Sequence, residues 1–356
     1  MIIGMPDTNH VNPDSQIEID DTSPDWDSPE SLDICVIGAG AVGGLIGGHM
    51  AQRGANVTLI DKGPHLDALQ DTGLTLLSRN GDRNVIDTIE STEHVTTDRP
   101  VDLVVLGVKA YDLEEIAPMI PQLTGPTTTI LPVQNGIPWW YFQQYRGKFD
   151  GYRIDAIDSD GRLERYIPAE RIVGCVPFVA STIVEPGTVK HTEGEWFPVG
   201  ELHGRQTNRV QGIANLFEDV GLRSRVLEDI RSEVWLKALG NLAFNPMSVL
   251  TRATLGEMCR NPGTRAVARA MMEEAKVVAE ACGAEFRRTI EERIDGAERV
   301  GDHNTSMLQD FDRGNKLETE ALVGSVIELA SLTDHDVPTI ETVYALVNLL
   351  EDTTQP

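Results

Sequence analysis

The segment between Glu233 and Pro246 places one lysine and two asparagines on one face of an expected helix. Lys237, Asn241 and Asn245 follow at intervals of four residues and form a narrow polar stripe. The surrounding residues are mostly apolar, and each Asn costs about 0.6 kcal/mol of helix propensity relative to Ala, so a merely solvated face would carry better helix formers. An ammonium beside two amides can bind and protonate a carbonyl group, if apolar surroundings bring the lysine pKa towards neutrality. The alternative is a lysine that reaches solvent beside two structural asparagines.

A second candidate site is a glycine motif close to the start of the chain. Gly38, Gly40 and Gly43 form G-x-G-x-x-G between a short apolar run at 34–37 and a stretch with helical spacing at 45–53. Gly38 would allow a tight turn, Gly40 would let the backbone approach a pyrophosphate, and Gly43 would let helix and strand pack closely. Free N–H groups at the helix N-terminus would face the phosphates. The motif predicts a dinucleotide site, and its alternative is a glycine-rich turn that binds nothing.

The end of the next expected strand leaves the choice of dinucleotide open. Asp61 is placed to accept hydrogen bonds from ribose hydroxyls and would repel a 2′-phosphate. Its neighbour Lys62 could pair with that phosphate, so NADP(H) and NAD(H) both remain possible cofactors. Both residues could also be no more than a solvated strand end.

The elements that must position these residues indicate two domains. A βαβ start is followed by strand candidates at 103–108, 129–133 and 172–180, with helical stretches between several of them, which predicts an open parallel sheet. The segment 188–202 resembles two more strands, and a helix is expected at 207–220. We therefore expect an α/β Rossmann-type domain over 31–228. The domain over 229–356 is expected to be all-α, with amphipathic helices at 232–250, 265–281, 289–300 and 316–332.

Composition excludes several classes of partner. The formal net charge is −26, so nucleic acid and anionic membrane surfaces would be repelled. Residues 1–30 contain eight acidic side chains and no Lys or Arg, which predicts a disordered acidic tail. The four widely spaced cysteines suggest neither a metal site nor a disulfide framework, and no apolar run is long enough to span a bilayer. We expect a cytoplasmic protein without a metal.

Five short segments together resemble the ketopantoate reductase family in order and spacing over residues 32–345. They are the glycine motif, Gly107-Val108-Lys109-Ala110, Gln134-Asn135-Gly136, the Lys237 helix and Ser306-Met307-Leu308-Gln309-Asp310. The resemblance implies a Rossmann domain followed by a helical domain like the C-terminal domain of 6-phosphogluconate dehydrogenase. It also implies NAD(P)H-dependent reduction of 2-dehydropantoate (ketopantoate) to pantoate. Sites in such a build lie in the cleft between the domains.

The resemblance also assigns roles to single residues. It implies that Lys237 is the general acid and that Glu318 assists this lysine and holds the substrate hydroxyl. Asn241, Asn245 and Ser306 match substrate-binding residues, with Ser306 on the carboxylate. Lys109 and Asn135 match residues at the nicotinamide end of the cofactor, and Lys62 stands where the family commonly has an Arg for the 2′-phosphate. Asp61 departs from the NADPH pattern.

Each assignment has a structural alternative. Glu318 lies three residues after Asn315 and could complete a capping box. Ser306 lies in the first turn of an expected helix, where Ser is common without any ligand. Lys109 could be an exposed strand end, and Asn135 could be a turn residue.

The substrate is the less secure part of the prediction. The bulky segment 137–140 and the polar loop 148–170 could reshape the pocket relative to the family. One alternative function is therefore a dehydrogenase of the same build that acts on another 2-oxo or hydroxy acid or an opine. A second is a non-catalytic dinucleotide-binding sensor, against which the presence of Lys237 and Glu318 counts. The helical domain could supply the face of a homodimer.

Overall fold

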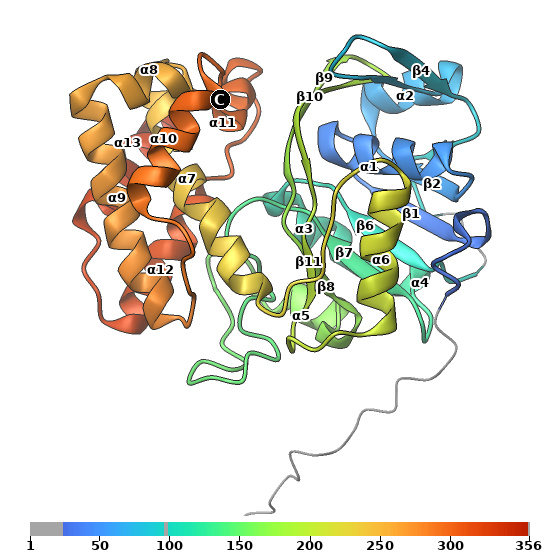
Figure 1. Cartoon of the computed structure of the whole chain (residues 1–356), viewed down its shortest axis with the longest axis horizontal. Helices are drawn as coiled ribbons and strands as arrows, with labels where there is room; N and C mark the ends of the chain where they lie inside the picture. The colour runs from blue at the N-terminus through green and yellow to red at the C-terminus, as the bar shows by residue number, and fades with distance from the viewer. Residues whose placement is uncertain (1–23, 96–98, 355–356) are drawn as a thin grey trace, which may run out of the picture.

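The structure, a computed structural model, describes residues 24–95 and 99–354, and Figure 1 shows a sheet domain joined to a helical domain. Five parallel strands at the centre of the sheet domain have the order β5-β2-β1-β6-β7. This confirms the expected Rossmann-type sheet. The order reverses between β1 and β6, and ligands of such sheets bind beyond the carboxyl ends of the strands at that point. The strands are β1 (Asp33–Ile37), β2 (Asn56–Ile60), β5 (Glu90–Thr92), β6 (Leu103–Leu106) and β7 (Thr129–Pro132).

The apolar runs are continuous because both faces of this sheet are covered. Ile34 and Val36 of β1 enter a core that includes α1 (Ala41–Gln52). Cys35 and Ile37 face the opposite core, which continues into the helical domain. Alternate residues of one strand therefore stabilise two separate layers. Short helices of this domain are α2 (Gly63–Thr72), α3 (Leu113–Ile116), α4 (Ile120–Leu123) and α5 (Arg162–Tyr166).

A second sheet was only partly foreseen. Four strands in the order β4-β3-β10-β9 pack against the other side of α1, and β11 pairs with β8. The expected strand at 172–180 is split at Pro177, which has no N–H to donate to a ladder. The two strands expected in 188–202 are present as β10 and β11, but they pair outside the five-stranded parallel sheet. The strands are β3 (Leu74–Leu77), β4 (Arg83–Ile86), β8 (Val173–Cys175), β9 (Phe178–Glu185), β10 (Thr188–Trp196) and β11 (Val199–Glu201).

The last part of the predicted N-terminal tail is ordered. Residues 1–23 lie outside the described residues, but Trp26 is buried and packs on α6 (Asn208–Asp219). Gly212 makes room for it, because a Cβ there would lie 2.3 Å from Cγ of Trp26. The prediction of disorder through residue 30 was therefore wrong for the last seven residues, because one buried indole offsets the ordering entropy of a short segment.

The helical domain is organised around α7 (Ile230–Thr251), which leads out of the sheet domain (Figure 1). Asp229 caps it by accepting a hydrogen bond from the Ser232 N–H at 3.0 Å. The helix expected at 316–332 starts only at Thr319 with a π-helical turn, so Glu318 stands before the helix. The other helices are α8 (Leu255–Arg260), α9 (Pro262–Ala281), α10 (Ile290–Val300), α11 (Ser306–Asp312), α12 (Ser325–Thr333) and α13 (Pro338–Thr354).

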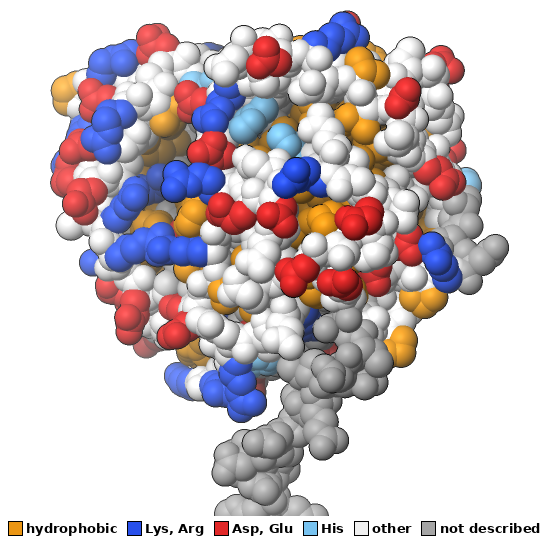
Figure 2. All heavy atoms as spheres, turned by 45° about the vertical axis from the view of Figure 1, so that its right-hand side comes forward, with side chains coloured by type: hydrophobic (Ala, Val, Ile, Leu, Met, Phe, Trp, Pro, Cys, Tyr) orange, Lys and Arg blue, Asp and Glu red, His pale blue; other side chains and the backbone are white. Residues whose placement is uncertain are grey.

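Charged side chains of both signs lie on the surface (Figure 2). Figure 2 shows acidic and basic side chains interspersed over one face of the molecule. Among the described helices, none combines the length and apolar character that crossing a membrane would require.

Candidate active site

The glycine motif forms a tight loop at the carboxyl end of β1. Gly38 has a φ of +90°, which favours glycine, and its N–H donates to the carbonyl of Ile60 at 2.8 Å. A Cβ on Gly43 would lie 2.1 Å from the Gly38 oxygen, so helix α1 approaches β1 as closely as a glycine permits. At Gly40 a Cβ would meet nothing within 4 Å. The loop therefore has one open side, at the N-terminus of α1, where the first helical N–H groups face outward.

A histidine that the sequence reasoning missed anchors this loop. His65 Nε2 lies 3.0 Å from the Ala39 carbonyl, and its Nδ1 accepts a hydrogen bond from the Gly187 N–H at 3.1 Å. The ring thus joins the loop to the turn between β9 and β10. A lone histidine twenty-odd residues after the motif carries no signal for this contact in the sequence.

Asp61 and Lys62 lie at the carboxyl end of β2, next to the glycine loop. The Asp61 carboxylate accepts a hydrogen bond from the Lys62 N–H at 2.7 Å. The Lys62 side chain is exposed and its charge opposes the rise in the pKa of Asp112 that burial causes. Both a ribose acceptor and a free ammonium are therefore available at the same edge.

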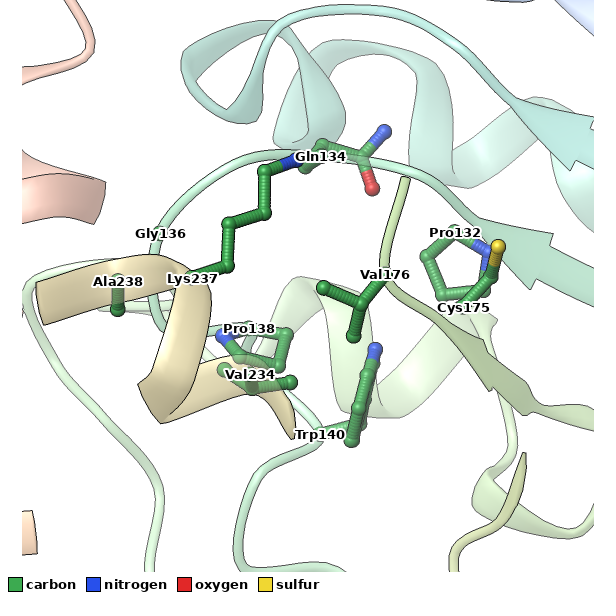
Figure 3. A pocket seen from close by; sticks show the side chains of 10 residues that line it. All are labelled: Pro132, Gln134, Gly136, Pro138, Trp140, Cys175, Val176, Val234, Lys237 and Ala238. Carbon is green, nitrogen blue, oxygen red and sulfur yellow. The ribbon is translucent and has the colours of Figure 1, made fainter. Parts of the chain in front are cut away.

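Lys237 projects from α7 into a small pocket that closes against the sheet domain. Figure 3 shows its side chain crossing from the helix towards the segment that carries Gln134. Its ammonium donates to the Pro177 carbonyl at 2.5 Å. The pocket is mostly apolar and is lined by Pro132, Gln134, Gly136, Pro138, Trp140, Cys175, Val176, Val234, Lys237 and Ala238.

This apolar surrounding changes the acidity of the lysine. The pKa of Lys237 is lowered to about 8, mainly by burial; Cys175 and Glu318 oppose this shift, and the charge of Arg293 adds to it. Burial also raises the pKa of the Cys175 thiol to about 12, so the neighbour of the ammonium is neutral at pH 7. An ammonium with such a pKa can give up a proton near neutral pH, as a general acid must.

Glu318 contacts a different lysine from the one expected. Its Oε2 lies 3.2 Å from Nζ of Lys109, and its Oε1 accepts from the Ala110 N–H at 3.3 Å. Asp310 binds the same ammonium at 2.7 Å. Among the described residues no hydrogen bond joins Glu318 to Lys237. The Lys237 ammonium donates to the Pro177 carbonyl, and the charge of Glu318 still acts on the pKa of Lys237. The capping-box alternative does not apply, since the helix begins only at Thr319 and Asn315 is not its N-cap.

Lys109 is therefore the centre of a charged cluster between the two domains. Burial opposes the charged form of Lys109, but Glu318 and Asp310 outweigh it and raise its pKa. The side chains of Asp310 and Glu318 are only 10% and 5% exposed. The sequence analysis assigned no role to Asp310. The position of this acid, close to Met307, Leu308 and Phe311, could have indicated a buried carboxylate that needs a cation.

The substrate-binding candidates differ in their surroundings. Asn245 is buried, and its Nδ2 has no hydrogen-bond partner among the described residues. Asn241 is half-buried on the same face of α7, while Ser306 is exposed at the start of α11. Thr305, not Ser306, caps that helix through the Leu308 N–H at 3.2 Å. The Ser306 hydroxyl is thus not used for capping.

The segment with Asn135 spans both domains. Gln134 donates to the carbonyls of Leu106 and Val108 at 2.7 and 3.0 Å, and the Ile137 N–H donates to the Ala321 carbonyl at 3.0 Å. Asn135 is half-buried between these anchors, at the carboxyl end of β7. Trp140 of the bulky segment lines the pocket of Lys237, so this segment does shape the site.

Comparison with known proteins gives consistent matches along the chain. The family model described as "Ketopantoate reductase PanE/ApbA" matches residues 34–204, and "Ketopantoate reductase PanE/ApbA C terminal" matches residues 229–351. A 2-dehydropantoate 2-reductase of Mesorhizobium japonicum is 39% identical over 320 residues, 90% of this chain and 98% of the relative. One from Archaeoglobus fulgidus is 28% identical over 82% of this chain and 89% of the relative. The crystal structure of a PanE/ApbA family ketopantoate reductase from Ralstonia eutropha JMP134 has a TM-score of 0.78 at 26% identity, covering 91% of this chain and 100% of that one.

Proposed function

Since the chain belongs to the ketopantoate reductase family, whose members are oxidoreductases that act on CH–OH groups, we propose that it reduces 2-dehydropantoate to pantoate. The observation that carries the proposal is the Lys237 ammonium, whose pKa is lowered to about 8 in an apolar pocket between the two domains. A 2-oxo acid has a carbonyl oxygen that needs one proton during reduction. Lys237 is the group best suited to give it.

The residues of the sheet domain fit a nicotinamide dinucleotide. The open side of Gly40 and the N-terminus of α1 would hold its pyrophosphate, and Asp61 or Lys62 would contact the adenosine ribose. Lys109 and Asn135 lie at the carboxyl ends of β6 and β7, where the reactive end would lie. When bound, such a cofactor supplies the hydride for the carbonyl carbon.

The helical domain then supplies the proton and the substrate contacts. Lys237 donates a proton to the carbonyl oxygen and becomes a neutral amine, which solvent later protonates again. Asn241, Asn245 and Ser306 offer amide and hydroxyl groups to the substrate, and the buried Nδ2 of Asn245 has no hydrogen-bond partner among the described residues. Glu318 accepts two hydrogen bonds already and keeps acceptor capacity for the substrate hydroxyl.

The test is to mix the protein with 2-dehydropantoate and follow nicotinamide absorbance, with NADPH and NADH in parallel. We expect turnover that falls about 10²–10⁴-fold in Lys237→Ala, the usual range for loss of a general acid. The exposed Lys190→Ala is the matched control and should turn over normally. If the protein binds the cofactor and does not reduce 2-dehydropantoate but does reduce another 2-oxo acid, the proposed substrate is rejected. The proposed reaction, reduction of a 2-oxo acid, is then retained. Full activity of Lys237→Ala would reject the acid.

A further inference from the structure

Arg293 of α10 has a guanidinium without a counter-ion among the described residues. Its Nε is buried and has no hydrogen-bond partner, and its side chain forms no ion pair with any residue in 24–95 or 99–354. Burial lowers its pKa and the charge of Arg288 adds to this effect, while Glu233 opposes it. The Glu233 carboxylate is already paired with Arg287 at 2.6 Å. A buried, unpaired charge is costly, so its presence calls for an anion that the described residues do not supply.

The guanidinium lies directly on α7, beside the polar stripe. A Cβ on Gly240 would lie 2.5 Å from Nη2 of Arg293 and 3.0 Å from its Cζ. Gly240 stands three residues after Lys237 and one before Asn241, so Arg293 borders the same face of the helix. Glycine weakens a helix interior relative to alanine, and here it gives the space in which the guanidinium sits. Two independent features, the unpaired charge and the glycine, therefore mark one position next to the proposed acid.

The charges around this position match a 2-oxo acid. Lys109 pairs with both Glu318 and Asp310, whereas Lys237 and Arg293 have no carboxylate within ion-pair distance in the part of the chain that the structure describes. In a 2-oxo acid the carboxylate is bonded to the carbonyl carbon, so an acid placed for the carbonyl oxygen brings the carboxylate close to a second cation. Arg binds a carboxylate through two parallel N–H donors, which fixes its orientation.

We propose that Arg293, whose guanidinium sits in the space left by Gly240 beside Lys237, binds the carboxylate of the 2-oxo acid substrate. This inference rests on the proposed function, because it takes Lys237 as the acid. A carboxylate has about four acceptor positions, so Ser306 can bind the same group. Arg293 thus selects for an anionic substrate and orients its carbonyl towards the ammonium.

The experiment compares 2-dehydropantoate with its uncharged methyl ester in the wild type, Arg293→Gln and the control Arg288→Gln, which removes an exposed arginine. We expect Arg293→Gln to raise KM for the acid about 10–100-fold and to leave the ester and the Kd of NADPH unchanged. Arg288→Gln should behave as the wild type. Unchanged KM for the acid in Arg293→Gln, or equal losses for acid and ester, would overturn the inference alone. A wild type that reduces neither compound would reject the proposed function and the inference with it.

A second test displaces the Arg293 guanidinium without removing its charge, and it uses one variant and one control. Gly240→Ala places a methyl group where the guanidinium sits and should raise KM for the acid at least about fivefold, again without an effect on the ester. Gly296→Ala is the control, because its nearest atom is 3.8 Å from the new Cβ. Bound NADPH, measured by fluorescence, shows that each variant is folded. Normal KM in Gly240→Ala would contradict the proposed position of Arg293.

Discussion

Lys109 and Glu318, 209 residues apart in the sequence, form an ion pair that joins the sheet domain to the helical domain, with 3.2 Å between Nζ and Oε2. Asp310 contacts the same ammonium at 2.7 Å. The lysine lies just beyond the carboxyl end of β6, and both carboxylates come from the opposite side of the cleft. The cluster therefore fixes the distance between the domains at the place where cofactor and substrate would meet.

Lys109→Met should destabilise the protein, because two nearly buried carboxylates lose their cation. We expect the free energy of unfolding at pH 7 to fall by about 1–3 kcal/mol, measured by urea denaturation. Lys190→Met, which removes an exposed lysine, should change it by less than about 0.5 kcal/mol. An equal effect of both substitutions would show that the cluster does not hold the domains.

The reaction should depend on pH through Lys237. Its pKa is lowered to about 8, so the proton-donating form is lost as the pH rises through about 8. For reduction, kcat/KM should therefore fall above pH 8, whereas pantoate oxidation, which needs the neutral amine, should rise over the same range. The charge of Arg293 helps to lower this pKa, so Arg293→Gln should move both limbs to higher pH. Profiles that coincide in wild type and variant would contradict this electrostatic link.

Two glycines of the motif should respond differently to alanine. At Gly40 a methyl group meets no protein atom, so Gly40→Ala should change stability by less than about 1 kcal/mol and weaken NADPH binding at least about tenfold. Gly43→Ala clashes with the Gly38 oxygen and should lose both stability and binding. Thermal unfolding and fluorescence titration distinguish the two. Wild-type affinity in Gly40→Ala would mean that the open side of the loop binds no pyrophosphate.

Asn245 should separate stability from substrate binding. Because its buried Nδ2 lacks a partner, Asn245→Leu should keep the free energy of unfolding or raise it by up to about 1 kcal/mol, while KM rises about tenfold. Ser248→Ala is the contrasting variant, since it removes a hydroxyl that is hydrogen-bonded to Thr305. This substitution should lower the free energy of unfolding without changing KM. A large loss of stability in Asn245→Leu would show that the amide has a structural role.

Asp61 and Lys62 should control the choice between the two cofactors. Lys62→Ala should raise Kd for NADPH about three- to fivefold and leave NADH unchanged, as expected for one exposed ion pair. Asp61→Asn should lower the Kd for NADPH and raise the Kd for NADH. The readout is the ratio of the two dissociation constants in each variant. Equal changes for both cofactors would exclude these residues from contact with the 2′-position.

Much of the fold could be predicted because the signals are local. The glycine motif follows an apolar run and opens a helix, and the four-residue spacing of Lys237, Asn241 and Asn245 is itself a helical pattern. Errors arose where tertiary contacts overrode local pattern. Trp26 orders a segment whose composition is typical of disorder, and the strands around Pro177 belong to different sheets.

The sequence alone determined which groups are available for chemistry, namely one lysine on an apolar helix and one dinucleotide motif. Only the tertiary structure decided which charges are paired. Glu318 pairs with Lys109 instead of Lys237, and Arg293 beside Gly240 has no counter-ion within residues 24–95 and 99–354. The reason is physical, since ion pairing depends on distances of a few ångströms between residues that lie up to 209 positions apart, and no local pattern encodes such distances.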